Sequence, residues 1–378
     1  MLLRKITLIL VCLIISISAN EKVLWKFETG GKVYATPLVS ENVVYVGSLD
    51  SNFYAVDKLS GKKIWQFNSG NPIHSTAIIH KDILIFESGN NLFFLNLKGE
   101  LIRKMKLGKA SKKSQIDSWD FFHSSPVIYN DKIYIGTSDG KVVGIDFFTG
   151  EKIVEIETGE PIRATPIVTD NKIFFGDWEG VFYSHNNITG EEFWKYDTKN
   201  DSTFIWKNSI HEKPLLVNDK IYMAGRSCRV YCLDKNSGQK IWSHKSSRSG
   251  WLLGGPAYSD GKIFLGSSNE AIVQCFTAET GELLWETKLD HRIWGIPLAV
   301  KNDLIIGSGS LYKLDKTSGE IKEVLIDRKT IEIPITKIDH PKWKGEEYQS
   351  SFHSSPVYSK GVVYIGCDDG NLYAVEVN

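Results

Sequence analysis

Short apolar runs separated by polar turns recur along most of this chain. A brief apolar strand that begins at a proline is followed by a longer run, such as residues 43–47 (Val-Val-Tyr-Val-Gly) or 172–176 (Lys-Ile-Phe-Phe-Gly). An Asp/Gly turn and an alternating strand such as residues 53–57 come next, and a Ser-Gly or Thr-Gly turn leads into a fourth strand. β-Branched and aromatic residues in short runs bounded by such turns predict a four-stranded antiparallel sheet.

Eight copies of this unit follow one another at intervals of roughly 40 to 50 residues. The first strand of each copy is marked by Pro37, Ala77, Pro126, Pro166, Pro214, Pro256, Pro297 and Pro356. One such sheet cannot bury both of its faces alone, so the copies must stack on one another. The sequence therefore predicts an all-β fold, an eight-bladed β-propeller of four-stranded antiparallel blades.

The eighth copy ends after its third strand, residues 371–375, and lacks a fourth. Residues 23–30 near the amino terminus closely resemble residues 64–70, which form the fourth strand of the first copy. We expect the amino-terminal strand to complete the last blade, which closes the ring without a long free sheet edge.

The amino terminus reads as a secretory signal. Arg4 and Lys5 precede an apolar run over residues 6–15, and residues 16–19 (Ser-Ile-Ser-Ala) are mostly small. Cys12 follows Leu10-Val11 rather than the small residues of a lipid-attachment site, so we expect no lipid anchor. The predicted division is a signal peptide over 1–19 and a single propeller over 20–378. An uncleaved anchor is the alternative.

The amino-acid composition limits the classes of partner that we expect this protein to bind. The chain has 378 residues and a formal net charge of zero, which gives no sign of nucleic-acid binding. No other stretch is long and apolar enough for a transmembrane domain. We expect a periplasmic or extracellular protein, monomeric, whose partners are envelope or extracellular proteins. Cysteines 228, 232, 275 and 367 are too few for a disulfide scaffold and are expected to fill strands.

Residues 55–65 carry a family signature. The segment Ala55-Val-Asp-Lys-Leu-Ser-Gly-Lys-Lys-Ile-Trp65 resembles the Ala-x-Asp-x-x-Thr-Gly-x-x-x-Trp pattern of PQQ-like (quinoprotein-type) propeller repeats, with Ser60 replacing the threonine. The resemblance implies structural roles: the tryptophan packs between blades, and the aspartate shapes the turn. Copies with Arg103, Val154 or Glu323 in place of the tryptophan are expected to make weaker contacts between blades.

Length variation is concentrated in the connections between copies, which share one face of a propeller. Variable connections on a rigid scaffold commonly carry binding sites. Three long insertions contain aromatic or basic residues that we predict to bind a partner: Trp119, Phe204, Trp206, His340 and Trp343. The alternative is that the insertions only cover the propeller edge.

One repeat position, three residues before each start residue, is predicted to face the channel mouth. Around the ring it holds Tyr34, His74, His123, Arg163, His211, Leu253, Trp294 and His353. The four histidines lie on blades 2, 3, 5 and 8, too scattered for a predicted metal site. A polar, partly cationic funnel for an anionic or aromatic ligand is one hypothesis, with Arg163 able to hold a carboxylate bidentately. Inheritance of the repeat with hydrogen-bonded side chains is the other.

Two functions are compatible with the resemblance. Quinoprotein dehydrogenases of this family hold PQQ and Ca²⁺ beside a vicinal disulfide, but this chain has no Cys-Cys pair and no recognisable catalytic residues. The resemblance to scaffolds of BamB type implies a binding protein without a cofactor. We expect a non-enzymatic scaffold that binds a protein or ligand through the inter-blade-loop face. The alternative is a small PQQ-dependent oxidoreductase.

Overall fold

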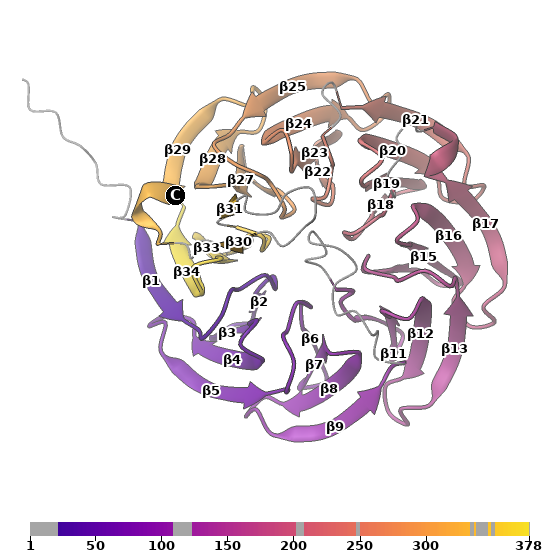
Figure 1. Ribbon diagram of the computed structural model, residues 1–378, viewed down its shortest axis with the longest axis horizontal. Helices are drawn as coiled ribbons and strands as arrows, with labels where there is room; N and C mark the ends of the chain where they lie inside the picture. The colour runs from indigo at the N-terminus through magenta and orange to yellow at the C-terminus, as the bar shows by residue number, and fades with distance from the viewer. Residues whose placement is uncertain are drawn as a thin grey trace, which may run out of the picture.

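A computed structural model confirms the eight-bladed propeller. It describes residues 22–108, 123–201, 208–246, 250–332, 336–337, 347–348 and 352–377. Eight four-stranded antiparallel sheets stand around a central axis (Figure 1). Within the described ranges, no helix is long and apolar enough to cross a membrane.

Each blade runs from an innermost to an outermost strand, and the predicted start residues precede the innermost strands. Blades 1 to 4 are β2(Leu38–Val39)–β3(Val43–Gly47)–β4(Asn52–Asp57)–β5(Lys63–Asn68), β6(Ile78–His80)–β7(Ile83–Ser88)–β8(Asn91–Asn96)–β9(Leu101–Lys106), β10(Val127–Tyr129)–β11(Lys132–Gly136)–β12(Lys141–Asp146)–β13(Lys152–Glu157) and β14(Ile167–Val168)–β15(Lys172–Gly176)–β16(Val181–Asn186)–β17(Glu192–Asp197).

Blades 5 to 8 repeat the arrangement. They are β18(Leu215–Val217)–β19(Lys220–Ala224)–β20(Arg229–Asp234)–β21(Lys240–Lys245), β22(Ala257–Ser259)–β23(Lys262–Ser267)–β24(Ile272–Thr277)–β25(Leu283–Lys288), β26(Leu298–Val300)–β27(Asp303–Gly307)–β28(Leu311–Asp315)–β29(Ile321–Ile326) and β32(Val357–Ser359)–β33(Val362–Gly366)–β34(Asn371–Glu376)–β1(Val23–Glu28). Short 3₁₀ turns, η1(Thr198–Asp201) and η2(Arg328–Thr330), follow β17 and β29, and β30(Thr336–Lys337) pairs with β31(Glu347–Tyr348).

The amino-terminal strand closes the ring, as the sequence predicts. β1 is antiparallel to β34, with Phe27 opposite Leu372 and Glu28 opposite Asn371. The Thr29 amide donates to the Gly370 carbonyl at 2.8 Å, and Lys22 forms an ion pair with Glu323 of blade 7 at 2.6 Å. The amino-terminal strand is therefore held both by the third strand of the last blade and by the preceding blade.

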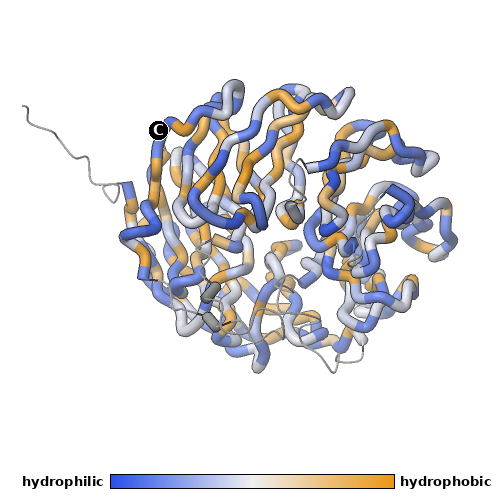
Figure 2. The backbone as a smooth tube through the Cα atoms, turned by 45° about the horizontal axis from the view of Figure 1, so that its top comes forward, coloured by the Kyte–Doolittle hydropathy of each residue, from blue (hydrophilic) through white to orange (hydrophobic). Residues whose placement is uncertain are grey.

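The core lies between the blades rather than inside any one of them. Val44 and Val56 of blade 1, for example, pack in one buried cluster with Leu372 and Ala374 of blade 8. Hydrophobic segments alternate with hydrophilic ones along the chain, and many of the outer connections are hydrophilic (Figure 2). Because each interface is completed by the next blade, the fold depends on closure of the ring.

The repeated tryptophans and turns have the structural roles that the family resemblance implies. The Trp25 indole Nε1 donates to the Lys58 carbonyl of the next blade at 3.1 Å, and Trp65 makes the same contact with Leu97 at 2.9 Å. In the turn itself, the Asp57 carboxylate accepts the Ser60 amide at 2.8 Å. The Ser60 hydroxyl also donates to this carboxylate at 2.6 Å, and the hydroxyl bond first, then the amide bond, holds the pKa of Asp57 below its ordinary value.

Arg103, expected to make a weaker contact than the tryptophan it replaces, still reaches the next blade. Its guanidinium donates to the carbonyls of Phe147 (2.6 Å) and Phe148 (3.3 Å) on the next blade and lies 4.0 Å from the centre of the Phe94 ring. A long cationic side chain thus makes two inter-blade hydrogen bonds where an indole makes one.

Candidate functional site

The residues that precede the predicted channel-mouth residues in sequence fix the backbone of this ring in place. At the seven ring positions whose preceding residue is described, that residue is a buried apolar anchor, such as Ile73, Ile162 or Phe352. Six of these anchors pack on a glycine at the end of the second strand of the preceding blade: a Cβ on Gly47, for example, would lie 2.3 Å from the Ile73 side chain. The Ile73 amide also donates to the Ser48 carbonyl at 3.1 Å. Two blades together therefore fix the backbone from which each ring side chain projects.

Five ring side chains on consecutive blades contact one another in one continuous row, in which two pairs are stacked and two are tilted. The ring-centre separations are 4.8 Å for Trp294–His353, 4.3 Å for His353–Tyr34, 5.9 Å for Tyr34–His74 and 4.6 Å for His74–His123. These separations are in the range of favourable aromatic contacts. The sequence placed these residues at one repeat position, but not in contact.

Two histidines of this row contact buried carboxylates. His353 Nδ1 lies 2.8 Å from Asp368, and His123 Nδ1 lies 3.3 Å from Glu87. Asp368 lies in the turn between the second and third strands of blade 8, and Glu87 lies near the end of the second strand of blade 2. A hydrogen bond to Nδ1 fixes the orientation of the imidazole and directs Nε2 away from the carboxylate.

The ring side chains fill the mouth instead of lining an open funnel. Tyr34, Leu253 and Trp294 from blades 1, 6 and 7 pack into one apolar cluster. Among the ring residues, only His74 and His123 are more than slightly exposed. The ring is thus a packed layer across the mouth rather than a solvated rim.

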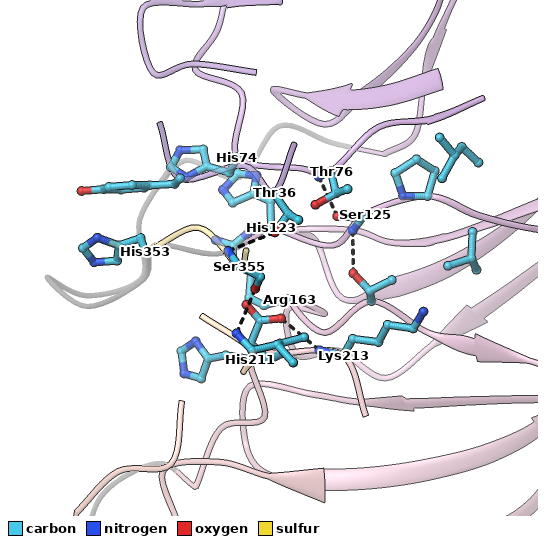
Figure 3. A pocket seen from close by; sticks show the side chains of 17 residues that line it. Thr36, His74, Thr76, His123, Ser125, Arg163, His211, Lys213, His353 and Ser355 are labelled. Carbon is cyan, nitrogen blue, oxygen red and sulfur yellow. Dashed lines mark hydrogen bonds between the residues drawn. The ribbon is translucent and has the colours of Figure 1, made fainter. Parts of the chain in front are cut away.

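A cavity of ≈ 250 Å³ lies against this layer (Figure 3). Six of the predicted ring residues line it: Tyr34, His74, His123, Arg163, His211 and His353. Trp294 and Leu253 do not, because they are buried against Tyr34. The structure thus brings together six of the seven ring residues predicted to bind a ligand.

Beneath the ring, hydroxyl groups link neighbouring blades in a belt (Figure 3). The Thr76 amide donates to Ser125 Oγ at 2.8 Å, and the Ser125 amide donates to Thr165 Oγ1 at 3.0 Å. The Ile296 amide likewise donates to Ser355 Oγ at 2.9 Å. These hydroxyls satisfy backbone donors where neighbouring first strands approach most closely.

Blade 5 departs from this belt. At the two positions where the other copies, apart from Ile296 of blade 7, have small or hydroxyl-bearing residues, it has Glu212 and Lys213, and both line the cavity. Solvent reaches Glu212, but protein surrounds its carboxyl group, and this desolvation raises its pKa to about 7. Desolvation also lowers the pKa of Lys213. Repeat-by-repeat comparison of these positions could have identified the pair, which the ring prediction missed.

Two guanidinium groups make the blade 4–5 wall electropositive. Arg163 is buried and donates to Ser138 Oγ at 2.6 Å. Arg226 lies between two indoles, 4.9 Å from the centre of the Trp178 ring and 4.7 Å from that of Trp251. Burial and then the nearby charges of Arg226 and Arg163 lower the pKa of His211 well below its ordinary value. His211 is therefore neutral at physiological pH, and the fixed cations there are the arginines.

The remaining predicted site residues lie outside the described residues: Trp119, Phe204, Trp206, His340 and Trp343. Within the described part of the chain, no group of three or more His, Cys, Asp or Glu side chains is arranged to hold a metal ion. The four described cysteines are buried, and none of them forms a disulfide.

The fold and the cavity define the class: an eight-bladed PQQ-like β-propeller with a polar central cavity. The particular family follows from sequence comparison. The family profile described as "Outer membrane protein assembly factor BamB" matches residues 13–196, 118–249 and 226–378. The chain belongs to this family.

Individual relatives are distant. The outer membrane protein assembly factor BamB of Yersinia pestis is 24% identical over 201 residues, which cover 48% of this chain and 47% of the relative. The quinohemoprotein alcohol dehydrogenase of Pseudomonas putida is 27% identical over 115 residues, or 26% of this chain and 16% of the enzyme. The matches thus span about half or less of these curated relatives.

Solved structures share the fold over nearly the whole chain. The crystal structure of BamB from Moraxella catarrhalis superposes with a TM-score of 0.68 at 17% identity, covering 94% of this chain and 97% of that one. At such low identity the similarity establishes the architecture alone.

The cavity does not fit the Ca²⁺–quinone pair of the dehydrogenases. Ca²⁺ requires six to eight oxygen ligands, commonly including several carboxylates, and no such cluster occurs among the described residues. Glu212 is the carboxyl group in the cavity lining, and its raised pKa opposes the ionised form that a cation needs. The lining residues therefore suit an anion better than a metal-bound quinone.

Proposed function

We propose that this protein is a periplasmic scaffold that binds envelope proteins through its inter-blade-loop face. The observation that carries the proposal is membership of a family described as an outer membrane protein assembly factor, matched along almost the entire chain. A rigid ring whose long insertions fall in the connections between blades supports the choice of face.

Site-specific photocrosslinking in cells tests the proposal. A photoreactive amino acid would replace Trp206 or Trp343 in the insertions, and Asn236 in a turn on the opposite face would provide the matched control. We expect crosslinks to envelope proteins from the two insertion sites and not from position 236. Equal crosslinking from all three sites, or products with cytoplasmic proteins only, would contradict the proposal.

A second function, binding of a small anion in the cavity, is favoured by the electropositive blade 4–5 wall. Arg163 and Lys213 line the cavity, and Arg226 stands behind His211. A volume of ≈ 250 Å³ lies below the usual range for drug-sized ligands and suits a small carboxylate or phosphate.

Calorimetric titration with oxalate and inorganic phosphate tests this second function. Affinity should be higher at pH 6 than at pH 8, because the Glu212 carboxyl ionises near pH 7 and then repels the anion. Arg163→Gln should abolish binding, and Lys213→Met should weaken it without disturbing the buried Ser138 contact. Unchanged affinity in the Lys213 variant, or no heat with either anion, would exclude the cavity as an anion site.

A further inference from the structure

Besides the exposed apolar residues of the outermost strands, four exposed apolar side chains stand in turns on the face opposite the inter-blade connections. This lower face carries the turns between first and second strands and those between third and fourth strands. The two kinds of turn meet in each blade: the Lys58 amide donates to the Asn42 carbonyl at 2.9 Å, and the Phe147 amide to the Asp131 carbonyl at 3.0 Å.

The apolar residues occupy the third-to-fourth-strand turns of blades 1 to 4 only. They are Leu59 (90% exposed), Leu97 (37%), Phe148 (61%) and Ile188 (47%), here called the apolar arc. The corresponding positions on blades 5, 6 and 7 are Asn236, Glu279 and Thr317. The repeat therefore does not require apolar residues in these turns, and half of the ring has them.

The turns hold these side chains outward. The Phe148 amide donates to Asp146 Oδ1 at 3.0 Å, and the Ile188 amide donates to Asn186 Oδ1 at 2.9 Å. Since all four residues occupy one turn of equivalent blades, they stand at similar height around the ring. Apolar side chains that stand at one height and are spaced one blade apart can all contact a flat surface. They do not form the continuous strip that a segment bound in a groove would contact.

The amino-terminal strand begins on this same face, next to the arc. The Lys22 carbonyl accepts the Glu376 amide at 2.8 Å, where the third strand of blade 8 ends. Trp25 then packs over the blade 1 turn: a Cβ on Gly61 would lie 2.7 Å from its ring. The apolar run of residues 6–15 thus precedes a strand that starts beside the Leu59 turn.

Charges around the arc suit insertion at a membrane interface. The Lys81 ammonium lies 4.3 Å from the centre of the Phe148 ring, and Lys172 lies 5.3 Å from that of Phe193. Lysine stems can cover apolar surface while the ammonium reaches the headgroups. Lysines and carboxylates nearly balance on these four blades' lower turns, so contact with lipid would depend on apolar insertion rather than on anionic lipid.

We propose that the lower face of blades 1 to 4 rests on a lipid bilayer, with the apolar arc inserted at the boundary between headgroups and acyl chains. The inter-blade-loop face then points away from that membrane. This inference is independent of the scaffold function, since it concerns the opposite face.

An environment-sensitive fluorophore at residue 59 tests the inference in the full chain. The four described cysteines are buried, so Cys12→Ser with Leu59→Cys leaves one reactive thiol on the surface. Phosphatidylcholine vesicles should shift the emission to the blue and raise its intensity, and spin-labelled lipid should quench it. The same label in Thr317→Cys, the equivalent turn of blade 7, should respond to neither.

Phe148→Asp in the labelled Leu59→Cys protein should weaken the lipid response about tenfold, as expected for loss of one buried apolar side chain. Addition of phosphatidylglycerol or salt should change it little. An unchanged emission at residue 59 in protein that floats with the vesicles would overturn the inference. A blue shift without vesicles that grows with protein concentration would overturn it too, because the arc would then contact a second copy of the chain.

Discussion

Replacement of Trp25 by alanine tests whether the amino-terminal strand closes the ring. Trp25 lies on β1, packs on the Gly61 turn of blade 1, and donates its indole N–H to the Lys58 carbonyl at 3.1 Å. Its ring centre is also 5.8 Å from that of Tyr364 on blade 8. The side chain therefore joins the first and last blades directly.

The size of the effect follows from these contacts. Truncation of a fully buried Trp costs about 3–5 kcal/mol, and Trp25 is partly exposed, which places its packing loss near 2 kcal/mol. The lost indole hydrogen bond adds about 1 kcal/mol. With an unfolding entropy of about 2.1 cal/mol/K per residue, a loss of about 3 kcal/mol lowers the Tm of this chain by roughly 4 °C.

Differential scanning calorimetry provides the assay, and Leu24→Ala provides the matched control. Leu24 is the preceding residue of the same strand but is 53% exposed, so its truncation should shift Tm by less than about 1 °C. If the two variants melt together, the closure contacts do not stabilise the ring and the reasoning fails. Deletion of residues 21–30 should lower Tm much further, because it also removes every β1–β34 hydrogen bond.

Three further predictions concern the repeat and its exceptions. Arg103→Ala should lower the free energy of unfolding by about 2–3 kcal/mol, since two inter-blade hydrogen bonds are lost; urea titration should show Lys104→Ala to be nearly neutral by comparison. Gly61→Ala should cost several times more than Gly261→Ala, because both glycines have positive φ (+69 and +74) but only Gly61 would clash, with Trp25; similar unfolding midpoints would refute this. Glu212→Gln should stabilise the protein by about 1–2 kcal/mol at pH 8 and not at pH 4. The raised pKa of the Glu212 carboxyl means that the folded state binds the proton more tightly than the unfolded state does. The stability of the native protein therefore falls as pH rises from about 4.5 to 7. Melting temperatures of both proteins across that pH range measure the effect.

The architecture could be predicted because the repeat encodes it redundantly. Each start residue, turn glycine and inter-blade tryptophan occurs several times, so the loss of the tryptophan at Arg103 did not obscure the blade. The ring residues could also be placed, since a shared repeat position becomes a shared height on the axis. What they do there could not be predicted, because it depends on distances across the axis. The buried cluster of Tyr34, Leu253 and Trp294 joins blades 1, 6 and 7 and leaves no periodic trace in the sequence.

Residues that depart from the repeat are better candidates for a functional role than the recurring residues, which stabilise the fold. The hydroxyls at Ser125 and Ser355 have a structural role, because each accepts an amide from the preceding blade. Lys213 occupies the same position in blade 5, has no such hydroxyl, and instead lines the cavity beside Glu212. The same contrast holds on the lower face, where Leu59 and Phe148 replace the polar Asn236 and Thr317 of equivalent turns. A propeller requires neither the charged pair nor the exposed apolar residues. The two faces are therefore best tested at these exceptional positions, where substitution leaves the shared framework of the blades intact.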